Sequence, residues 1–434
     1  MPDALPPSPS APLAEWLAWW ERLHPTGIDM GLGRVSEVAA RLGLVKRGRL
    51  AGSYPPQVIT VAGTNGKGST AAILASLAHG HGRRVGSYTS PHLVRYNERV
   101  IIDGEPASDA QLVAGFVEVE KARAAAPEIS LTYFEAGTLC ALWCLLHAGL
   151  DLLVLEVGLG GRLDAVNIID ADVAVVTTIA RDHAGFLGND IAHIGREKAG
   201  IFRPGRPAVL GSDALPASVE EVAAEQRAPI YALGKAFSRT SMAADGWAFH
   251  RDAGPSLEAL PDPGLPLDNA ATALQALALV GVDLDPAAVR QALEQVSLPG
   301  RMQWHGRWCL DVGHNPHAAA YVAGRLAARA APGRRWCLLG MLDDKDAAGV
   351  IAALAPAISD WVCVGLDGPR GRDAQALAAD VVGEGGRVRH CAASPEAGAD
   401  WLDERLTDDD IVLVAGSFFT VGALLATPRF GGSA

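Results

Sequence analysis

The stretch that most narrowly limits the fold of this chain is "VITVAGTNGKGSTAAILASL", from Val58 to Leu77. A β-branched run leads into a glycine-rich turn and then into a segment with helical spacing. The N–H groups and positive dipole end of such a helix favour anions, and glycines let the backbone approach phosphate oxygens. The common phosphate loop places Ser or Thr directly after its Lys, whereas here Gly68 separates Lys67 from Ser69. The pattern predicts a variant phosphate loop; a turn that only lets a helix pack closely on a sheet is the alternative.

Composition limits the class of protein further. The 434 residues allow two or three domains, and with 49% hydrophobic and 20% charged residues a large core is expected. The net charge of −12 argues against a nucleic-acid partner but not against an anionic small substrate. The first dozen residues lack the basic start and apolar run typical of a secretory signal, no charge-free apolar run reaches membrane-spanning length, and the six cysteines form no CxxC pair. We expect a reduced, cytoplasmic protein with no membrane partner.

Alternating patterns predict an α/β fold with two domains. Through the first two thirds, β-branched runs alternate with amphipathic segments, which favours a mostly parallel sheet covered by helices. Residues 230–266 predict a small antiparallel patch, and a helical pair is expected from Asn269 to Gln295. A second alternating series then predicts a smaller, Rossmann-like C-terminal α/β domain. We place the P-loop-containing N-terminal domain at residues 1–296 and the C-terminal domain at 297–434.

Polar residues follow two of the expected strands. Glu156 ends "LDLLVLE", and Asp182 and His183 follow "VAVVTTIA". The carboxyl ends of parallel strands form the edge where such sheets bind ligands, and the Mg²⁺ that accompanies ATP prefers oxygen ligands. Glu156 and His183 are therefore predicted metal ligands. The alternatives are a solvent-exposed strand-end acid and a structural histidine.

These and other motifs together resemble one family. They run in order along nearly the whole chain, and they are "GTNGKGS", "TSPHLVRYNERV", "LTYFEAGTL", "EVGLGGRLDAVN", "IGREKAGIFRPG", "LPGRMQ", "DVGHNPHAA", "GMLDDKD" and "IVLVAGSFFTVGALL". The chain resembles the folylpolyglutamate synthase/dihydrofolate synthase family of the Mur ligase superfamily, whose phosphate loop also has a glycine between Lys and Ser.

The resemblance implies an ATP-dependent ligase. ATP would phosphorylate the carboxylate of a pteroate or folate, and the amine of L-glutamate would displace phosphate from the resulting acyl phosphate. Dihydropteroate would yield dihydrofolate, and tetrahydrofolates would be polyglutamylated. The expected partners are these small molecules, with Mg²⁺ as cofactor and ATP as substrate, and we expect a monomer.

The resemblance also assigns residues to ATP and the metal. The expected ATP-binding residues are Asn65, Gly66, Lys67, Gly68, Ser69, Asn269, Arg301 and Asp311. Among them, Asn269 would lie near the base, Arg301 toward the phosphates and Asp311 toward the ribose. The implied magnesium ligands are Ser90, Glu156 and His183, and the implied catalytic residues are Lys67, Glu156, His183 and Lys198.

Lys198, in "REKAGI", occupies a position where the family commonly carries a carbamylated lysine that helps to bind magnesium. From the sequence alone, Lys198 beside Glu197 and Arg196 would be a solvated charge on a helix.

The expected substrate-binding residues are Thr132, Tyr133, Phe134, Glu135, Asp164, Ala165, His314 and Ser417. Tyr133 and Phe134 offer flat surfaces for a pterin, although two aromatics at a helix start are often core residues. His314 and His317 have a spacing that occurs in zinc sites, but with no third ligand nearby in the sequence, substrate contact is favoured.

Three alternative functions remain. One is a monofunctional folylpolyglutamate synthase. Another is a Mur-type ligase for a UDP-linked cell-wall precursor, which the motifs and the mere 57 residues before the loop disfavour. The third is a nucleotide switch, but a guanine-specific switch would carry Asn-Lys-x-Asp, and no Asn here precedes a Lys.

Overall fold

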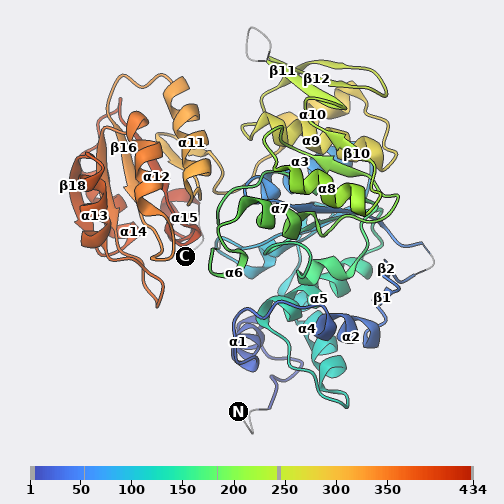
Figure 1. Ribbon diagram of the computed structural model, residues 1–434. Helices are drawn as coiled ribbons and strands as arrows, with labels where there is room; N and C mark the ends of the chain where they lie inside the picture. Colours follow the sequence, from blue (N-terminus) through green and yellow to red (C-terminus); the bar gives the residue numbers. More distant parts are fainter. Residues whose placement is uncertain (1–4, 53, 183, 242–245, 432–434) are drawn as a thin grey trace. The chain divides into compact units, whose positions relative to one another are not determined.

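The computed structural model describes residues 5–52, 54–182, 184–241 and 246–431. The chain divides into two compact units: an N-terminal unit of Met1–Pro91 with Asn97–Val296, and a C-terminal unit of Ser297–Ala434 with His92–Tyr96. Among the helices within these described ranges, none combines the length and apolarity that crossing a membrane requires. The predicted α/β fold, with a large mostly parallel sheet, a small antiparallel sheet and a second α/β unit, is confirmed (Figure 1).

The N-terminal unit is built on an eight-stranded sheet in the order β10-β9-β8-β3-β7-β4-β5-β6. Its strands are β3 Gln57–Ala62, β4 Val85–Tyr88, β5 Val100–Ile102, β6 Glu105–Pro106, β7 Leu152–Glu156, β8 Val173–Val176, β9 Ala208–Leu210 and β10 Ile230–Ala232. The run from β10 to β4 is parallel, and β5 and β6 add an antiparallel edge. Every residue of β7 and β8 is buried, as expected of strands covered on both faces. The phosphate-loop strand β3 lies between these two.

Helices surround this sheet. They are α1 Leu13–Leu23, α2 Gly33–Arg41, α3 Lys67–Gly80, α4 Asp109–Ala124, α5 Tyr133–Leu146, α6 Ala184–Leu187, α7 Ile191–Ala199, α8 Ala217–Glu225, α9 Leu267–Leu279 and α10 Pro286–Gln295. The helical pair predicted from Asn269 to Gln295 is α9 and α10. Helix α1, which the sequence reading did not identify, buries Trp16 and Trp20.

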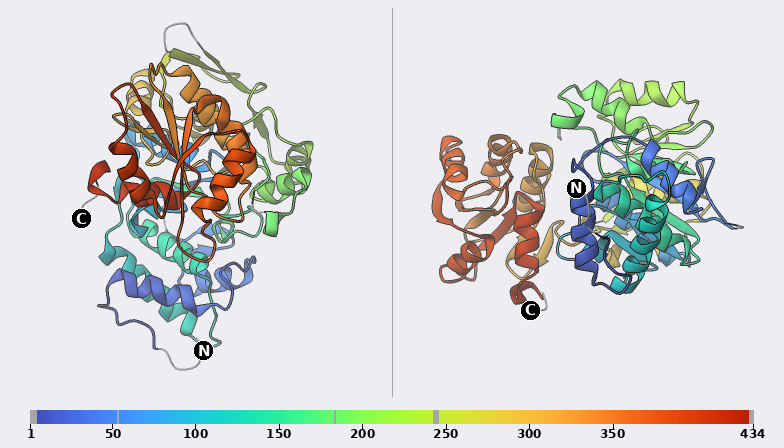
Figure 2. Two further views of the ribbon diagram at one scale, coloured as in Figure 1. Left: turned by 90° about the vertical axis from the view of Figure 1, so that its left-hand side faces the viewer. Right: turned by 90° about the horizontal axis from the view of Figure 1, so that it is seen from below.

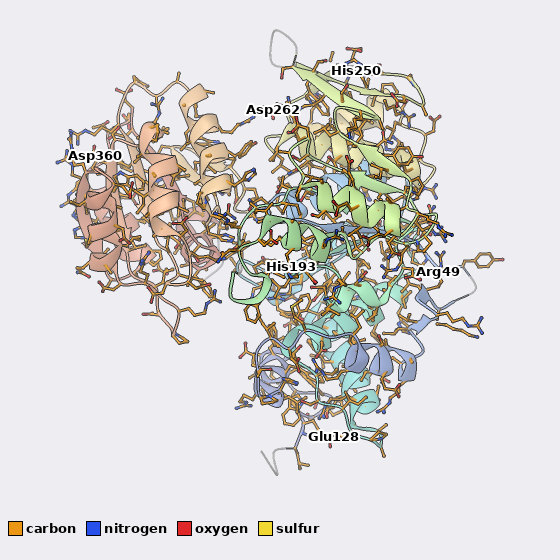
Figure 3. All side chains as sticks on the ribbon, in the orientation of Figure 1. Arg49, Glu128, His193, His250, Asp262 and Asp360 are labelled. Carbon is orange, nitrogen blue, oxygen red and sulfur yellow. The ribbon has the colours of Figure 1, made fainter. Side chains whose placement is uncertain are left out.

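Two smaller β structures complete this unit. The antiparallel sheet is β11 Phe237–Ser241, β12 Gly246–Arg251 and β13 Leu257–Pro261, within the predicted residues 230–266. The predicted patch begins too early, because residues 230–232 form β10 and pair in parallel with β9 of the large sheet. A short hairpin joins β1 Val45–Lys46 to β2 Arg49–Leu50. Arg49, labelled in Figure 3, pairs with Asp172 at 3.2 Å, which ties the hairpin to the segment just before β8.

The C-terminal unit has a six-stranded sheet in the order β14-β15-β19-β16-β17-β18. Its strands are β14 Gln303–His305, β15 Trp308–Leu310, β16 Arg335–Leu339, β17 Asp360–Val364, β18 Val388–Ala392 and β19 Ile411–Ala415, and its helices are α11 Pro316–Ala328, α12 Ala347–Leu354, α13 Ala374–Gly383, α14 Pro395–Asp403 and α15 Phe418–Leu425. The strands fan out between helices in the left view of Figure 2.

Alternate side chains of these strands pack into two separate hydrophobic clusters. Cys337 and Cys363 belong to one buried cluster, whereas Leu338 and Val362 belong to another. Successive side chains of a strand point to opposite faces, so one run of apolar residues fills both layers. The exception is Asp360, labelled in Figure 3, which is 1% exposed and accepts a hydrogen bond from Arg389 Nε at 2.5 Å.

Candidate active site

The phosphate loop connects β3 to α3 and requires glycine at two positions. Gly66 has φ +86°, and a Cβ there would lie 2.8 Å from both amide atoms of Asn269. Gly63 has φ +149°, and a Cβ there would lie 1.9 Å from Thr177 Oγ1. Both backbone conformations are ones that L side chains rarely adopt. The loop therefore brings its backbone against α9 and the end of β8, and Lys67 opens α3 as predicted.

Threonines beyond the end of β8 hold this loop through side-chain hydrogen bonds. Thr64 Oγ1 donates to Ala180 O at 3.1 Å and accepts from Ala180 N at 3.0 Å. Thr178 Oγ1 accepts from Asn65 N at 3.1 Å and donates to Asn65 O at 3.0 Å, and Thr177 Oγ1 donates to the same carbonyl at 2.7 Å. The sequence reading missed these two threonines; their signal was the pair of hydroxyls at a strand end beside a glycine-rich loop.

Two lysines converge on one carbonyl of the loop. Lys67 Nζ donates to Gly63 O at 3.1 Å and to Thr64 O at 3.3 Å. Lys198 Nζ, from α7, donates to Gly63 O at 2.8 Å. The structure thus places Lys198, far away in the sequence, beside the phosphate-loop lysine.

The expectation that Lys198 is a solvated helix charge is wrong. Lys198 is 5% exposed, and Glu197 is also buried. Burial, together with the nearby charge of Lys67, lowers the pKa of Lys198 to about 7, although Asp182 and Asp164 act in the opposite direction. Only the outer face of α7, which carries His193 (Figure 3), is exposed as a surface helix should be.

A small pocket lies beside these lysines. Its lining residues are Gly63, Thr64, Lys67, Gly158, Leu159, Gly160, Asp182, Leu187 and Lys198. The glycine turn after β7 packs closely on α7, because a Cβ on Gly161 would lie 2.8 Å from the carbonyl oxygens of Glu197 and Lys198. The motif "EVGLGGR" therefore forms one wall of the pocket.

The predicted metal ligands come from neighbouring strands. Glu156 is the last residue of β7 and 5% exposed, and its Oε2 accepts from the backbone N of Ser90 at 3.2 Å. The structure therefore brings Ser90 and Glu156 together, whereas His183 lies outside the described residues. Within the described residues there is no cluster of three or more His, Cys, Asp or Glu suited to a metal.

Asp164 is buried near the same glycine turn. Its carboxylate accepts from Leu159 N at 2.9 Å and Val166 N at 3.0 Å, which caps the short 3₁₀ helix Ala165–Ile168. Burial raises the pKa of Asp164 to about 6, although the backbone donors and Lys67 oppose that rise. The carboxyl group is thus placed to change protonation state in weakly acidic solution.

Thr132 and Glu135 form a capping box at the start of α5. Glu135 N donates to Thr132 Oγ1 at 3.2 Å, and Thr132 N donates to Glu135 Oε2 at 2.8 Å. Arg34 of α2 also pairs with Glu135 Oε1 at 3.1 Å. These contacts give both residues a structural function, and their binding of substrate stays a prediction.

Tyr133 and Phe134, the next two residues after Thr132, are half-buried. Phe134 packs on the glycine turn, since a Cβ on Gly158 would lie 2.5 Å from its ring. The guanidinium of Arg99 lies 5.7 Å from the centre of the Tyr133 ring. Phe134 is therefore the aromatic that reaches the pocket wall.

In the C-terminal unit, Asp311 lies just beyond the end of β15. It is 5% exposed and accepts from Met302 N at 2.9 Å and Gly313 N at 2.7 Å. Burial raises the pKa of Asp311, while Arg301 and the two backbone donors work against that rise. Asp311 fixes the turn that follows Arg301.

Arg301, His314 and Ser417 gather around a residue that the sequence reading missed, Phe418. The Arg301 guanidinium lies 5.0 Å from the centre of the Phe418 ring, and the His314 ring lies 6.0 Å from it. Ser417 is buried and caps α15 by accepting from Phe419 N at 3.0 Å. The signal was the first aromatic of "GSFF" at a strand-to-helix turn. His317, by contrast, is exposed on the first turn of α11.

Comparison with known proteins agrees with this arrangement. The Mur ligase middle domain matches residues 61–254, and the Mur ligase, glutamate ligase domain matches residues 300–418. The chain is 47% identical over 425 residues to the dihydrofolate synthase/folylpolyglutamate synthase of Escherichia coli strain K12, covering 96% of each chain.

Solved structures agree as well. E. coli FolC in complex with DHPP and ADP has a TM-score of 0.90 and 45% identity, over 96% of this chain and 98% of that one. The bifunctional folylpolyglutamate synthase/dihydrofolate synthase of Yersinia pestis, complexed with AMPPNP and an Mn ion, has a TM-score of 0.89 and 44% identity, over 97% and 98%. The chain therefore belongs to the dihydrofolate synthase/folylpolyglutamate synthase family, which is built from Mur ligase domains.

Proposed function

We propose that this chain uses ATP to join L-glutamate to dihydropteroate, forming dihydrofolate, and to reduced folates, extending their glutamate chains. Family membership supports the reaction class. The observation that carries the proposal at the site is the phosphate loop with two lysines on the Gly63 carbonyl and a buried Glu156 at the next strand end.

The reaction has two steps. The acceptor carboxylate attacks the γ-phosphorus of ATP, the bond to the bridging oxygen breaks, and ADP leaves an acyl phosphate. The glutamate amine then attacks the acyl carbon, loses a proton and displaces phosphate. Such chemistry depends on positioning and charge neutralisation more than on covalent help. Lys67 and the N–H groups from Gly66 to Ser69 would bind the phosphate oxygens, and Asn269 beside Gly66 supports its assignment to ATP.

The residues present fit a divalent cation. Glu156 offers a buried carboxylate, and Thr70 Oγ1 in the first turn of α3 has no hydrogen-bond partner among the described residues. Both are hard oxygen donors of the kind that Mg²⁺ prefers. Ser90, Glu156 and His183 would hold Mg²⁺, which when bound offsets negative charge on the transferred phosphoryl group.

The side-chain amine of Lys198 would carry a carbamate group. A neutral amine is needed to react with CO₂, and the pKa of about 7 makes that form available near neutral pH. The modification would exchange a buried cation beside Lys67 for an anion. An anion there would remove the repulsion between two neighbouring lysines and could join the metal site.

The remaining assignments concern the two acceptors and glutamate. Phe134, with Tyr133 and the Asp164–Ala165 pair, would bind the pterin, because Phe134 contacts the glycine turn that lines the pocket. In the C-terminal unit, Arg301 and Asp311 would bind ATP, and His314 and Ser417 would bind glutamate.

We further assign residues 1–296 as the ATP-binding domain and 297–434 as the glutamate ligase domain. We also propose that the protein works as a monomer in the cytoplasm. A single species of about 45 kDa in sedimentation is expected from the chain mass of 45.2 kDa; a dimer would contradict the monomer.

The substitution Glu156→Gln tests the site. It keeps the side-chain shape but removes the charge, so ligation of glutamate to dihydropteroate should fall by about 100-fold or more, because one electrostatic contact to a reacting phosphoryl group is worth that much. Glu105→Gln on the exposed edge strand β6 is the matched control and should ligate normally. Near-normal turnover of a folded Glu156→Gln protein would refute the metal site.

A further inference from the structure

Phe418 lies where the C-terminal unit presents its predicted ATP and glutamate residues. We infer that Phe418 is a positioning residue for ligation: its ring holds the Arg301 guanidinium and the His314 imidazole in place at the same time. The inference rests on the proposed function, because Arg301 is assigned to ATP and His314 to glutamate.

The ring itself is held by its surroundings. Phe418 is the first residue of α15, and the helix start is fixed because Ser417 accepts from Phe419 N at 3.0 Å. The half-buried ring packs against the apolar core cluster that includes Val312 and Val421. A ring anchored in this way can serve as a fixed surface for more mobile polar groups.

Arg301 is the first residue that contacts the Phe418 ring. Its guanidinium carbon lies 5.0 Å from the ring centroid, within the range of a cation–π interaction. An arginine side chain has many rotamers, and holding it on a ring reduces the entropy lost when it binds phosphate. Phe418 thus prepares Arg301 for an anion.

His314 is the second residue that contacts the Phe418 ring. Its ring lies 6.0 Å from the Phe418 ring at an interplanar angle of 54°, and its Nδ1 is 2.9 Å from Val312 O. The backbone carbonyl and the phenyl ring together fix the imidazole plane. Because one ring contacts both residues, loss of its π face should affect ATP and glutamate but not the folate acceptor.

The chain supplies its own matched control. Phe419, the next residue, is 63% exposed. The test compares Phe418→Leu, Phe418→Tyr and Phe419→Leu in steady-state kinetics, with ATP, glutamate and tetrahydrofolate varied separately. Thermal unfolding of each variant shows whether the fold is kept.

The expected result is selective. Phe418→Leu keeps apolar volume but lacks the π face, so the KM values for ATP and glutamate should rise by about threefold to thirtyfold, the range that a cation–π contact spans. The KM for tetrahydrofolate and the unfolding temperature should change little. Phe418→Tyr should recover most of the loss, and Phe419→Leu should match the parent protein.

Two results would overturn the inference. One is an unchanged KM for ATP and glutamate in Phe418→Leu. The other is a uniform rise of all three KM values with a lower unfolding temperature and no recovery by Tyr, which would make Phe418 a packing residue. If the parent protein binds ATP but ligates no glutamate, the proposed function fails instead. Calorimetric ATP binding then tests the Arg301 contact alone, and equal affinity of Phe418→Leu and the parent would refute it.

Discussion

At the scale of single residues, the site depends on buried charge. Lys67 could be predicted from its neighbours in the sequence, because the loop, the strand and the helix start are all local. The resemblance implies a role for Lys198, but its burial could not be predicted, because it comes from packing of α7 against the loop and the glycine turn after β7. A sequence shows that "REKAG" is helical and charged, but it does not show which face of the helix is covered.

The depressed pKa of Lys198 predicts a specific pH dependence of stability. Below pH 7 the lysine is charged in the folded and unfolded chains alike. Between about pH 7 and its ordinary pKa of 10.5, the unfolded chain binds more protons, so stability from this residue rises with pH. The free energy of unfolding of the parent minus that of Lys198→Met should therefore increase from pH 7 to 9.5, by on the order of a few kcal/mol.

Denaturant titrations in CO₂-free buffer measure this difference while keeping the amine unmodified. Lys46→Met, at an exposed position of β1, serves as the control and should show no such slope. A difference for Lys198→Met that stays flat across this range would mean that burial does not depress the pKa.

At the scale of elements, most of the fold could be read from hydrophobic period and turn residues. The central strands β3, β7 and β8, the strands β15 to β19 of the C-terminal sheet and the helical pair α9 and α10 were predicted, since each carries its own local pattern. Helix α1 was not predicted, because the proline-rich stretch before it gives no clear signal of where the helix begins. The short strand β14 was not predicted, although it forms a local hairpin with β15 through the turn at Gly306 and Arg307, because three residues are too few to show a clear alternating pattern.

The start of α5 shows how a local signal can have two meanings. "TYFE" was interpreted as a pterin contact, yet Thr132 and Glu135 also form a capping box. Thr132→Val removes the side-chain acceptor for Glu135 N and should lower the free energy of unfolding by about 1 kcal/mol. Thr132→Ser keeps the hydroxyl and should cost little. Urea denaturation of both variants measures the cap, and equal stability of Val and Ser would show that the cap contributes nothing.

At the scale of the whole molecule, the family resemblance rested on the order of many motifs. The order of the motifs indicates the class of reaction. The fold alone would not indicate it, because proteins with α/β folds catalyse many different reactions. We propose that the choice of acceptor depends on few residues, among them Phe134, whose ring packs against Gly158. Ligation of glutamate to both dihydropteroate and reduced folates is therefore the most specific activity proposed for this chain.

The measurement that tests this claim most directly is ATP- and Mg²⁺-dependent incorporation of ¹⁴C-labelled glutamate, with dihydropteroate and tetrahydrofolate supplied separately. Incorporation into both acceptors is the predicted result. Incorporation into tetrahydrofolate alone would leave a monofunctional polyglutamylating ligase and remove the dihydropteroate assignment of Tyr133 and Phe134. Incorporation into neither acceptor, by a protein that still binds ATP, would contradict the proposed function.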